Sequence, residues 1–178
     1  MIVKGDQFAI VVSDVDDYIA SAGKAFEHVA WVRDTVLAAT LFDHDVKPEM
    51  GSFPSVRYEI AFNYDMIPAL EFEIIRPISG RTVHSGLRPG SIGHVGCHLP
   101  EGKTFMDFLE TLRAQGGIVG QIFSTTQHSS SKRFYQYAYV WFPNVPFPVK
   151  VIQRLDNEIG LSNAKVLQEL YWGMFGGR

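Results

Sequence analysis

The stretch Ala-Leu-Glu-Phe-Glu-Ile-Ile-Arg-Pro-Ile (69–78) has the pattern of a β-strand that carries two carboxylates. Side chains of a strand alternate between its two faces. Glu71 and Glu73 therefore share one face, and the apolar residues between and beside them share the other. A sheet face that presents two carboxylates either lies in water or lines a functional site.

A second stretch, Ile-Gly-His-Val-Gly-Cys-His-Leu (92–99), predicts another strand. By the same alternation His94 and His98 lie on one face and Cys97 on the other. Imidazole and carboxylate groups on concave strand faces are common ligands of divalent metal ions. The alternative is a half-exposed sheet with its polar side chains in water, and for either strand alone it is the simpler interpretation.

Composition places the chain among soluble globular proteins. Its 178 residues are 46% hydrophobic and 20% charged, with a net charge of -3. The absence of a Lys/Arg-rich block argues against a nucleic-acid partner. We expect no signal peptide and no membrane span, because no long apolar run is present. The single Cys97 fits a cytoplasmic location, and its apolar strand face predicts a small core residue.

The predicted elements come in two similar sets. Each set has a strand, a helix and then about three strands, and an additional helix ends the chain. Segments 1–78 and 92–156 hold the two sets, 79–91 is predicted to be a linker, and 157–178 is a helical extension. The first set has a strand at 7–12, a helix from Ser13 to about Glu27, and strands at 29–32, 37–42, 56–63 and 69–75. The second set has a strand at 92–99, a helix at 104–115 and strands at 118–124, 134–142 and 149–155; the final helix is expected at 161–175.

This order of elements and three motifs resemble the vicinal oxygen chelate superfamily. That superfamily includes glyoxalase I, methylmalonyl-CoA epimerase, extradiol dioxygenases and bleomycin-resistance proteins. Residues 7–17 are similar to its opening strand and helix start, and 72–78 to its fourth strand. Residues 93–101, followed by 108–116, resemble the start of its second module, most closely in the glyoxalase and epimerase branch. The resemblance implies an α+β fold in which two βαβββ modules form a cup-shaped mixed sheet, with the C-terminal helix as an addition.

In that superfamily a metal ion in the cup takes one ligand from each of four strands. Carried over to this chain, the resemblance implies Gln7, Glu73, His94 and Gln153 as metal ligands. The last position departs from the usual Glu. An amide can bind a metal through its carbonyl oxygen, but it cannot accept a proton at neutral pH.

The resemblance further implies a metal-dependent isomerase or lyase that stabilises an enolate of a small oxygen-bearing substrate. The donor set suits Mn, Co, Ni, Zn, Mg or Fe, but it supplies a charge of only -1. Glu73 is the expected catalytic base, and Glu71 and His98 are the other candidates or partners of the metal ligands. Ring-cleaving dioxygenase chemistry is disfavoured, since it needs two histidines and one carboxylate at the expected places.

Aromatic residues alternate along the strand at 134–142. Tyr135, Tyr137, Tyr139 and Trp141 share a face, which either lines a wide aromatic pocket or packs under a helix. In the second case Gln136, on the opposite face, would point into the pocket.

The polar run 125–132 is predicted to be a mobile loop. Next to it Lys132 and Arg133 could contact an anionic group of a ligand, although most such pairs are only solvated. The remaining histidines lie in loops or at the ends of elements and are expected at the surface; they are His28, His44, His84 and His128.

Two alternatives to the enzyme remain open. One is a metal-free protein of the resistance type, which binds a small molecule in the same cup and needs no fourth carboxylate. The other is a scaffold whose apolar helix at 161–175 contacts a protein partner. The same helix could equally close the barrel or form a homodimer, and a homodimer is the association we expect.

Overall fold

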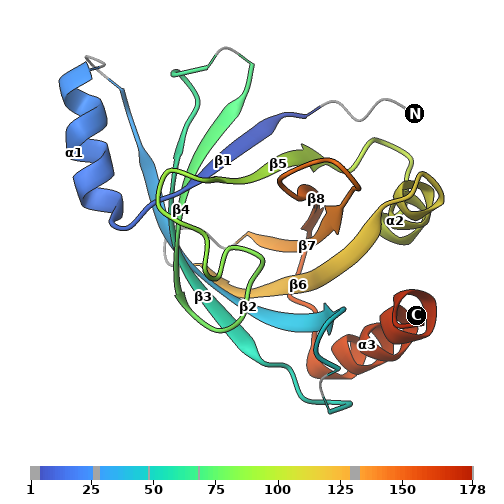
Figure 1. Cartoon of the computed structure of the whole chain (residues 1–178). Helices are drawn as coiled ribbons and strands as arrows, with labels where there is room; N and C mark the ends of the chain where they lie inside the picture. Colours follow the sequence, from blue (N-terminus) through green and yellow to red (C-terminus); the bar gives the residue numbers. More distant parts are fainter. Residues whose placement is uncertain (1–4, 26–28, 48, 68, 129–132, 178) are drawn as a thin grey trace.

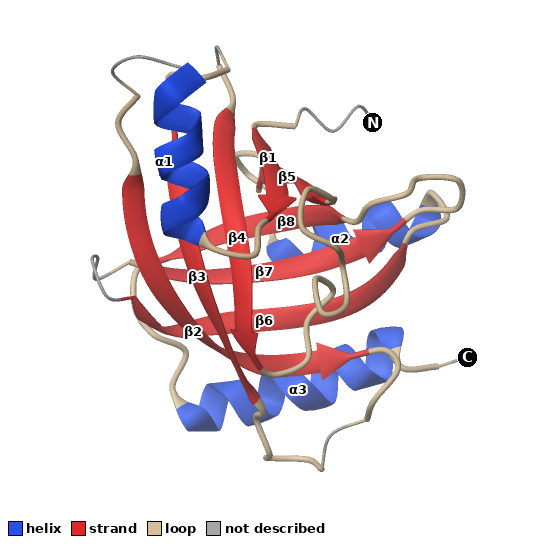
Figure 2. Ribbon diagram, turned by 60° about the vertical axis from the view of Figure 1, so that its left-hand side comes forward, coloured by secondary structure: helices blue, strands red, loops and turns tan. Residues whose placement is uncertain are grey.

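An eight-stranded sheet that closes on itself forms the centre of the protein (Figures 1 and 2). The computed structural model describes residues 5–25, 29–47, 49–67, 69–128 and 133–177. The strands are β1 (Gln7–Val11), β2 (Val32–Asp43), β3 (Ser55–Asn63), β4 (Glu71–Ser79), β5 (Ile92–His98), β6 (Ile118–His128), β7 (Phe134–Trp141) and β8 (Val149–Leu155). The helices are α1 (Val15–Ala25), α2 (Phe105–Ala114) and α3 (Leu161–Phe175).

Each half of the chain contributes four neighbouring strands to the closed sheet. Their order around it is β1-β4-β3-β2-β6-β7-β8-β5. Within the halves β1 is parallel to β4 and β5 is parallel to β8, and the other pairs are antiparallel. The halves meet at two antiparallel seams, β2 with β6 and β1 with β5. The predicted α+β fold of two βαβββ sets around a cup-shaped mixed sheet is confirmed.

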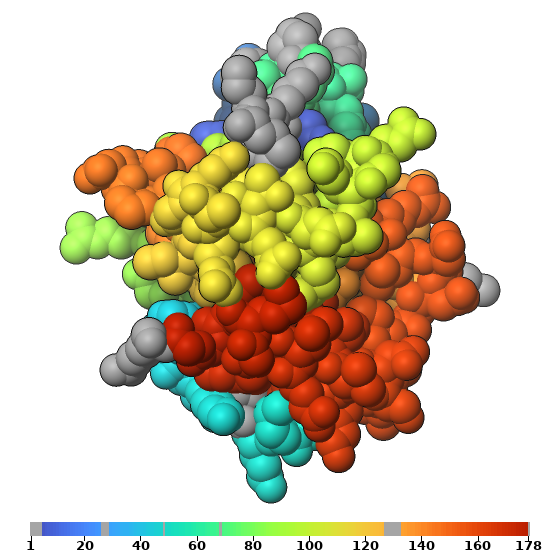
Figure 3. All heavy atoms as spheres, turned by 90° about the vertical axis from the view of Figure 1, so that its right-hand side faces the viewer, coloured from blue at the N-terminus to red at the C-terminus, as the bar shows by residue number. Residues whose placement is uncertain are grey.

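Helices cover the outside of the sheet on two sides. Helix α1 packs on β3 and β4, whereas α2 packs on β6 and α3 on β2 (Figure 1). The predicted apolar side of α2 is buried and shares a core with α3; Figure 3 shows the C-terminal helix directly beside the α2 region. Within the described residues, none of the helices has the length and apolar character needed to cross a membrane.

Helix α3 has the predicted bounds and is fixed to the barrel by buried amides. Gln168 is fully buried, accepts a hydrogen bond from the Gly51 N–H at 2.7 Å and donates one to the Ser52 carbonyl at 2.9 Å. The Gln136 amide donates to the hydroxyl of Tyr171 on the same helix. Gln136 thus faces α3, because its neighbours in β7 occupy the inner face of the barrel.

The predicted linker has structure of its own. Residues 80–91 fold against the interior of the barrel, where Val83 and Leu87 pack on the inner apolar cluster. The loop is bonded to β1, since the Gly90 N–H donates to the Val11 carbonyl at 2.8 Å. It therefore closes part of the barrel as well as connecting its two halves.

Two predicted boundaries were wrong. The strands expected at 29–32 and 37–42 are one strand, β2, whose pairing with β3 runs without interruption from Val32 to Ala39. Residues 125–128 of the expected loop belong to β6, because they pair with β2, and 129–132 lie outside the described residues. The described part of helix α1 runs to Ala25, and its expected end at Glu27 lies outside the described residues.

Gly80 and Gly86, both in the loop after β4, give a test of how tightly this loop is held. Both have a positive φ, of 82° and 85°. A Cβ on Gly80 would lie 2.4 Å from the Ser55 carbonyl oxygen, whereas one on Gly86 meets nothing within 4 Å. We expect Gly80→Ala to lower the free energy of unfolding by more than about 3 kcal/mol, and Gly86→Ala by only about 1–2 kcal/mol from its backbone conformation.

Urea unfolding of both variants measures this difference. Equal losses in the two variants would mean that the loop moves freely away from β3.

Candidate functional site

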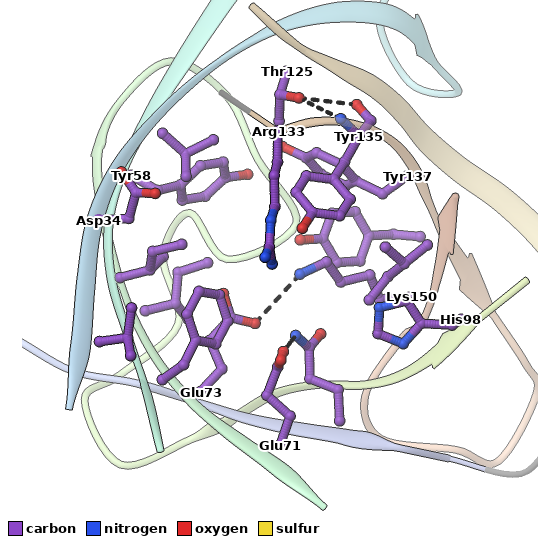
Figure 4. A pocket seen from close by; sticks show the side chains of 18 of the residues that line it. Asp34, Tyr58, Glu71, Glu73, His98, Thr125, Arg133, Tyr135, Tyr137 and Lys150 are labelled. Carbon is purple, nitrogen blue, oxygen red and sulfur yellow. Dashed lines mark hydrogen bonds and ion pairs between the residues drawn. The ribbon is translucent and has the colours of Figure 1, made fainter. Parts of the chain in front are cut away.

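A cavity of about 470 Å³ lies inside the barrel (Figure 4). It is open to solvent and has an apolar rim that includes Val32 and Tyr64. Strands β4, β7 and β8 contribute six of its polar side chains, which are Glu71, Glu73, Tyr135, Tyr137, Tyr139 and Lys150. The size suits a small organic molecule.

The faces of β4 and β5 are those that strand alternation predicts, with the polar side chains toward the cavity and Cys97 on the opposite face. Glu71 and Glu73 both line the cavity, and His98 lines it from β5. On the opposite face Cys97 is buried in the core, where burial raises the pKa of its thiol to about 12. Cys97 is therefore a core residue, as predicted.

Gln7, Glu73 and His94 meet at the inner end of this cavity. His94 Nε2 lies 2.9 Å from Gln7 Oε1 and 3.0 Å from Glu73 Oε2. The amide nitrogen of Gln7 donates to Glu71. Gln7 can lie this close to β5 because its partner there is Gly96, where a Cβ would be 2.6 Å from Gln7 Oε1. Three of the four predicted metal ligands are thus brought together.

Lys150, which the sequence analysis did not single out, completes this group. Its Nζ lies 3.3 Å from Glu73 Oε2, and only 11% of its side chain is exposed. It also lies 5.5 Å from the centre of the Tyr137 ring, a cation–π contact. Figure 4 shows the ammonium pointing from β8 across the cavity toward Glu73.

Glu73 is held as a carboxylate. Burial alone would raise its pKa, but the Lys150 ammonium and the hydrogen bond from His94 outweigh burial and lower the pKa to about 2. Burial and the Lys150 charge lower the pKa of His94 to about 4 against the opposing effect of Glu73. At neutral pH the ionised Glu73 therefore lies between a neutral His94 and the Lys150 ammonium.

The hydrogen-bond partners assign the proton on each imidazole. Gln7 Oε1 and Glu73 Oε2 are acceptors, so His94 Nε2 carries the proton and His94 Nδ1 accepts. His84 Nε2 lies 3.1 Å from His94 Nδ1 and must donate to it. His84 Nδ1 is then a bare acceptor, and it is buried without a hydrogen-bond partner among the described residues.

His84 was expected at the surface, and this prediction was wrong. It is 1% exposed, because the loop at 80–91 turns inward and packs the ring edge-on against Tyr58 and Tyr139. Burial and the neighbouring His94 lower its pKa well below the usual value. No local pattern marks this residue, since its neighbours come from strands far away in the sequence.

The aromatic face of β7 lines the cavity. Tyr135, Tyr137 and Tyr139 all point inward, which decides between the two interpretations of this strand. Burial raises the pKa values of Tyr137 and Tyr139 well above the usual one, so both phenols are neutral. Arg133, which precedes the strand, extends into the middle of the cavity (Figure 4). Lys132 lies outside the described residues.

Gln153 is the predicted ligand that the structure does not bring to the cavity. Lys150 and Ile152 are the β8 residues that line it, so alternation places Gln153 on the outer face with Val151, under the helices. The sequence contained a signal for this, because the apolar Val149 and Val151 lie on the same face as Gln153.

These donors do not fit a bound divalent ion in the arrangement seen. His94 Nε2 presents a proton rather than a lone pair to the cavity, and the Glu73 oxygen that a metal would use is bonded to both His94 and Lys150. Across the described part of the chain, no three His, Cys, Asp or Glu side chains converge as a metal-binding group. The fourth strand of the expected site supplies a cation in place of an oxygen ligand.

Comparisons with known proteins concern the fold. No protein-family model matches the chain, and no curated protein matches it. Among solved structures, a mutant of 4-hydroxymandelate synthase from Streptomyces coelicolor is 14% identical with a TM-score of 0.49; the match covers 94% of this chain but only 54% of that one. Methylmalonyl-CoA epimerase from Mycobacterium tuberculosis is 15% identical with a TM-score of 0.47, over 84% of this chain and 87% of that one.

A glyoxalase family protein from Bacillus cereus is 16% identical with a TM-score of 0.30, over 87% of this chain and 96% of that one. The closed sheet of this chain has the two βαβββ sets that the sequence resemblance predicts. At this level of identity no activity, substrate or metal is carried over from the three proteins.

The buried imidazoles predict how stability depends on pH. The pKa of His94 is about 4 in the folded protein against 6.5 ordinarily, so between these values the unfolded chain binds a proton that the folded one does not. The free energy of unfolding should therefore fall as the pH drops from about 6.5 to 4, by on the order of 3 kcal/mol for His94 at about 1.36 kcal/mol per pKa unit. Glu73, whose pKa is lowered from 4.5 to about 2, extends the loss below pH 4.5.

Urea unfolding between pH 7 and 4 checks this. The His84→Gln variant removes one of the two buried imidazoles and should show a shallower decline than the wild type. His44→Gln, at an exposed position, should keep the full decline. An unchanged slope in His84→Gln would show that His84 is solvated.

Proposed function

We propose that the protein binds a small molecule with a planar apolar body and one anionic oxygen group in the barrel cavity. The observation that carries this proposal is the pair of inward-pointing cations, Lys150 and Arg133, in a cavity walled by tyrosines. A planar body fits against the β7 tyrosines, and an anionic group fits the cations.

Three carboxylates, Asp34, Glu71 and Glu73, and two cations line the cavity, so the pairing of these groups decides which charge a ligand meets. Glu73 is paired with Lys150 and His94, and Glu71 accepts from Gln7. Arg133, in contrast, has no ion-pair partner among the described residues, so its guanidinium is open to a ligand. An ammonium has three hydrogen-bond donors, and Lys150 directs one of them to Glu73. A carboxylate, sulfonate or phenolate could accept from both cations.

The metal-dependent isomerase or lyase expected from the sequence stays a prediction. In its favour, Gln7, Glu73 and His94 are neighbours at one end of the cavity. Against it, Lys150 takes the place of an oxygen ligand, and a Glu73 with a pKa of about 2 is a weak base at neutral pH. The proposed binding function needs neither a metal nor a proton acceptor.

Glu71 and His98, the other candidates for a catalytic base, also line the cavity, and a catalytic role for them stays a prediction. Glu71 lines it and is bonded to Gln7, and His98 lies at 3.0 Å from Asp6. The expected homodimer and cytoplasmic location likewise stay predictions.

Two probes with the same rings separate the role of charge from that of the aromatic wall. They are 8-anilinonaphthalene-1-sulfonate, which is an anion, and N-phenyl-1-naphthylamine, which lacks the sulfonate. We expect saturable binding of the anion to the wild type by fluorescence titration. Arg133→Gln should raise the Kd of the anion about tenfold or more, which is the effect of one lost charged hydrogen bond, and leave that of the neutral probe unchanged.

Arg57→Gln is the matched control, because Arg57 is exposed on the outer face of β3. The Glu73→Gln/Lys150→Met double variant removes the ion pair without leaving a buried charge alone. It should also weaken binding of the anionic probe and leave binding of the neutral probe unchanged. Equal affinities of the two probes in the wild type, or equal losses with Arg57→Gln and Arg133→Gln, would refute the proposal.

A further inference from the structure

The cavity contains a cation of its own at the place where this fold was expected to bind a metal. Lys150 pairs in register with Gly96 of β5, and Gly96 pairs with Gln7 of β1. Lys150 is therefore level with Gln7 across three adjacent strands. Its ammonium reaches Glu73, which comes from β4 on the far side of β1.

The Lys150 ammonium is bound to the Glu73 oxygen that also contacts His94. Glu73 Oε2 is 3.3 Å from Lys150 Nζ and 3.0 Å from His94 Nε2, so the carboxylate is already shared between two donors. A divalent ion bound there would meet a positive charge in direct contact with its principal ligand. Repulsion between these cations opposes metal binding.

We propose that the Lys150 ammonium substitutes for the divalent cation of this fold and is the residue that keeps a metal out of the cavity. The consequence is a different mode of ligand binding. A metal ion chelates two oxygens of a ligand, whereas an ammonium offers directed hydrogen bonds to an anionic oxygen. Ligand binding to this protein is then independent of metal ions and chelators.

The inference predicts that one substitution converts the cavity into a metal site. Lys150→Glu removes the cation and adds a carboxylate beside Gln7, Glu73 and His94, which gives an imidazole, an amide oxygen and two carboxylates. His94 can present its Nε2 lone pair once its proton moves to Nδ1, where His84 Nε2 can accept it. The chain thus already contains the group that would orient a metal-bound His94.

Co²⁺ is a suitable probe, since its visible absorption reports coordination. We expect the wild type to bind no Co²⁺ in the cavity, Lys150→Met to bind it weakly, and Lys150→Glu to bind one equivalent at least 100-fold more tightly than Lys150→Met. Adding His94→Gln to Lys150→Glu should abolish the absorption band. Lys103→Glu, which makes the same change of charge in an exposed loop, is the control and should behave as the wild type.

Stoichiometric binding of Co²⁺ by the wild type, reduced by His94→Gln, would overturn the proposal. So would a folded Lys150→Glu variant that binds no Co²⁺. If two adjacent buried carboxylates prevent this variant from folding alone, it is refolded with Co²⁺, and failure to recover near-ultraviolet circular dichroism then counts against the proposal. The result is independent of the anion-binding proposal, which is tested with fluorescent probes on metal-free protein.

Discussion

The ionised Glu73 inside the barrel is the constraint on which the rest of the cavity depends. A carboxylate that is 1% exposed is costly to bury unless charge and hydrogen bonds compensate. Lys150 supplies the charge from β8, and His94 supplies the hydrogen bond from β5. Strands from both halves of the chain are therefore tied to one oxygen atom at the seam between β1 and β5.

The hydrogen bonds continue from this carboxylate to the loop that closes part of the barrel. His94 accepts from His84, so the position of the loop at 80–91 is coupled to the direction in which the His94 ring points. Each imidazole is neutral and donates one N–H. The hydrogen bonds therefore run in one direction, from His84 in the loop through His94 to Glu73. The segment that connects the two modules thus packs behind the wall of the cavity, where His84 contacts Tyr58 and Tyr139.

Much of the fold could be predicted from the sequence because alternation and helical spacing are local. They gave the bounds of α3, the buried side of α2, and the shared faces of Glu71 with Glu73 and of His94 with His98. The site was harder to predict. Gln153 was assigned from a resemblance although the apolar residues beside it pointed outward, and Lys150 was overlooked because a lysine in a strand is usually solvated. His84 could not have been found, since its burial depends on contacts with distant strands.

Closure of the sheet also limits how two copies of the chain can associate. Each of the eight strands is hydrogen-bonded to a neighbour on both sides, so the described barrel presents no open strand edge. Open edges are the usual starting points for intermolecular β-pairing and for aggregation. A dimer that leaves the barrel intact is consequently held by side chains and not by pairing of strand edges, and its interface can change by mutation without altering the hydrogen bonds of the barrel.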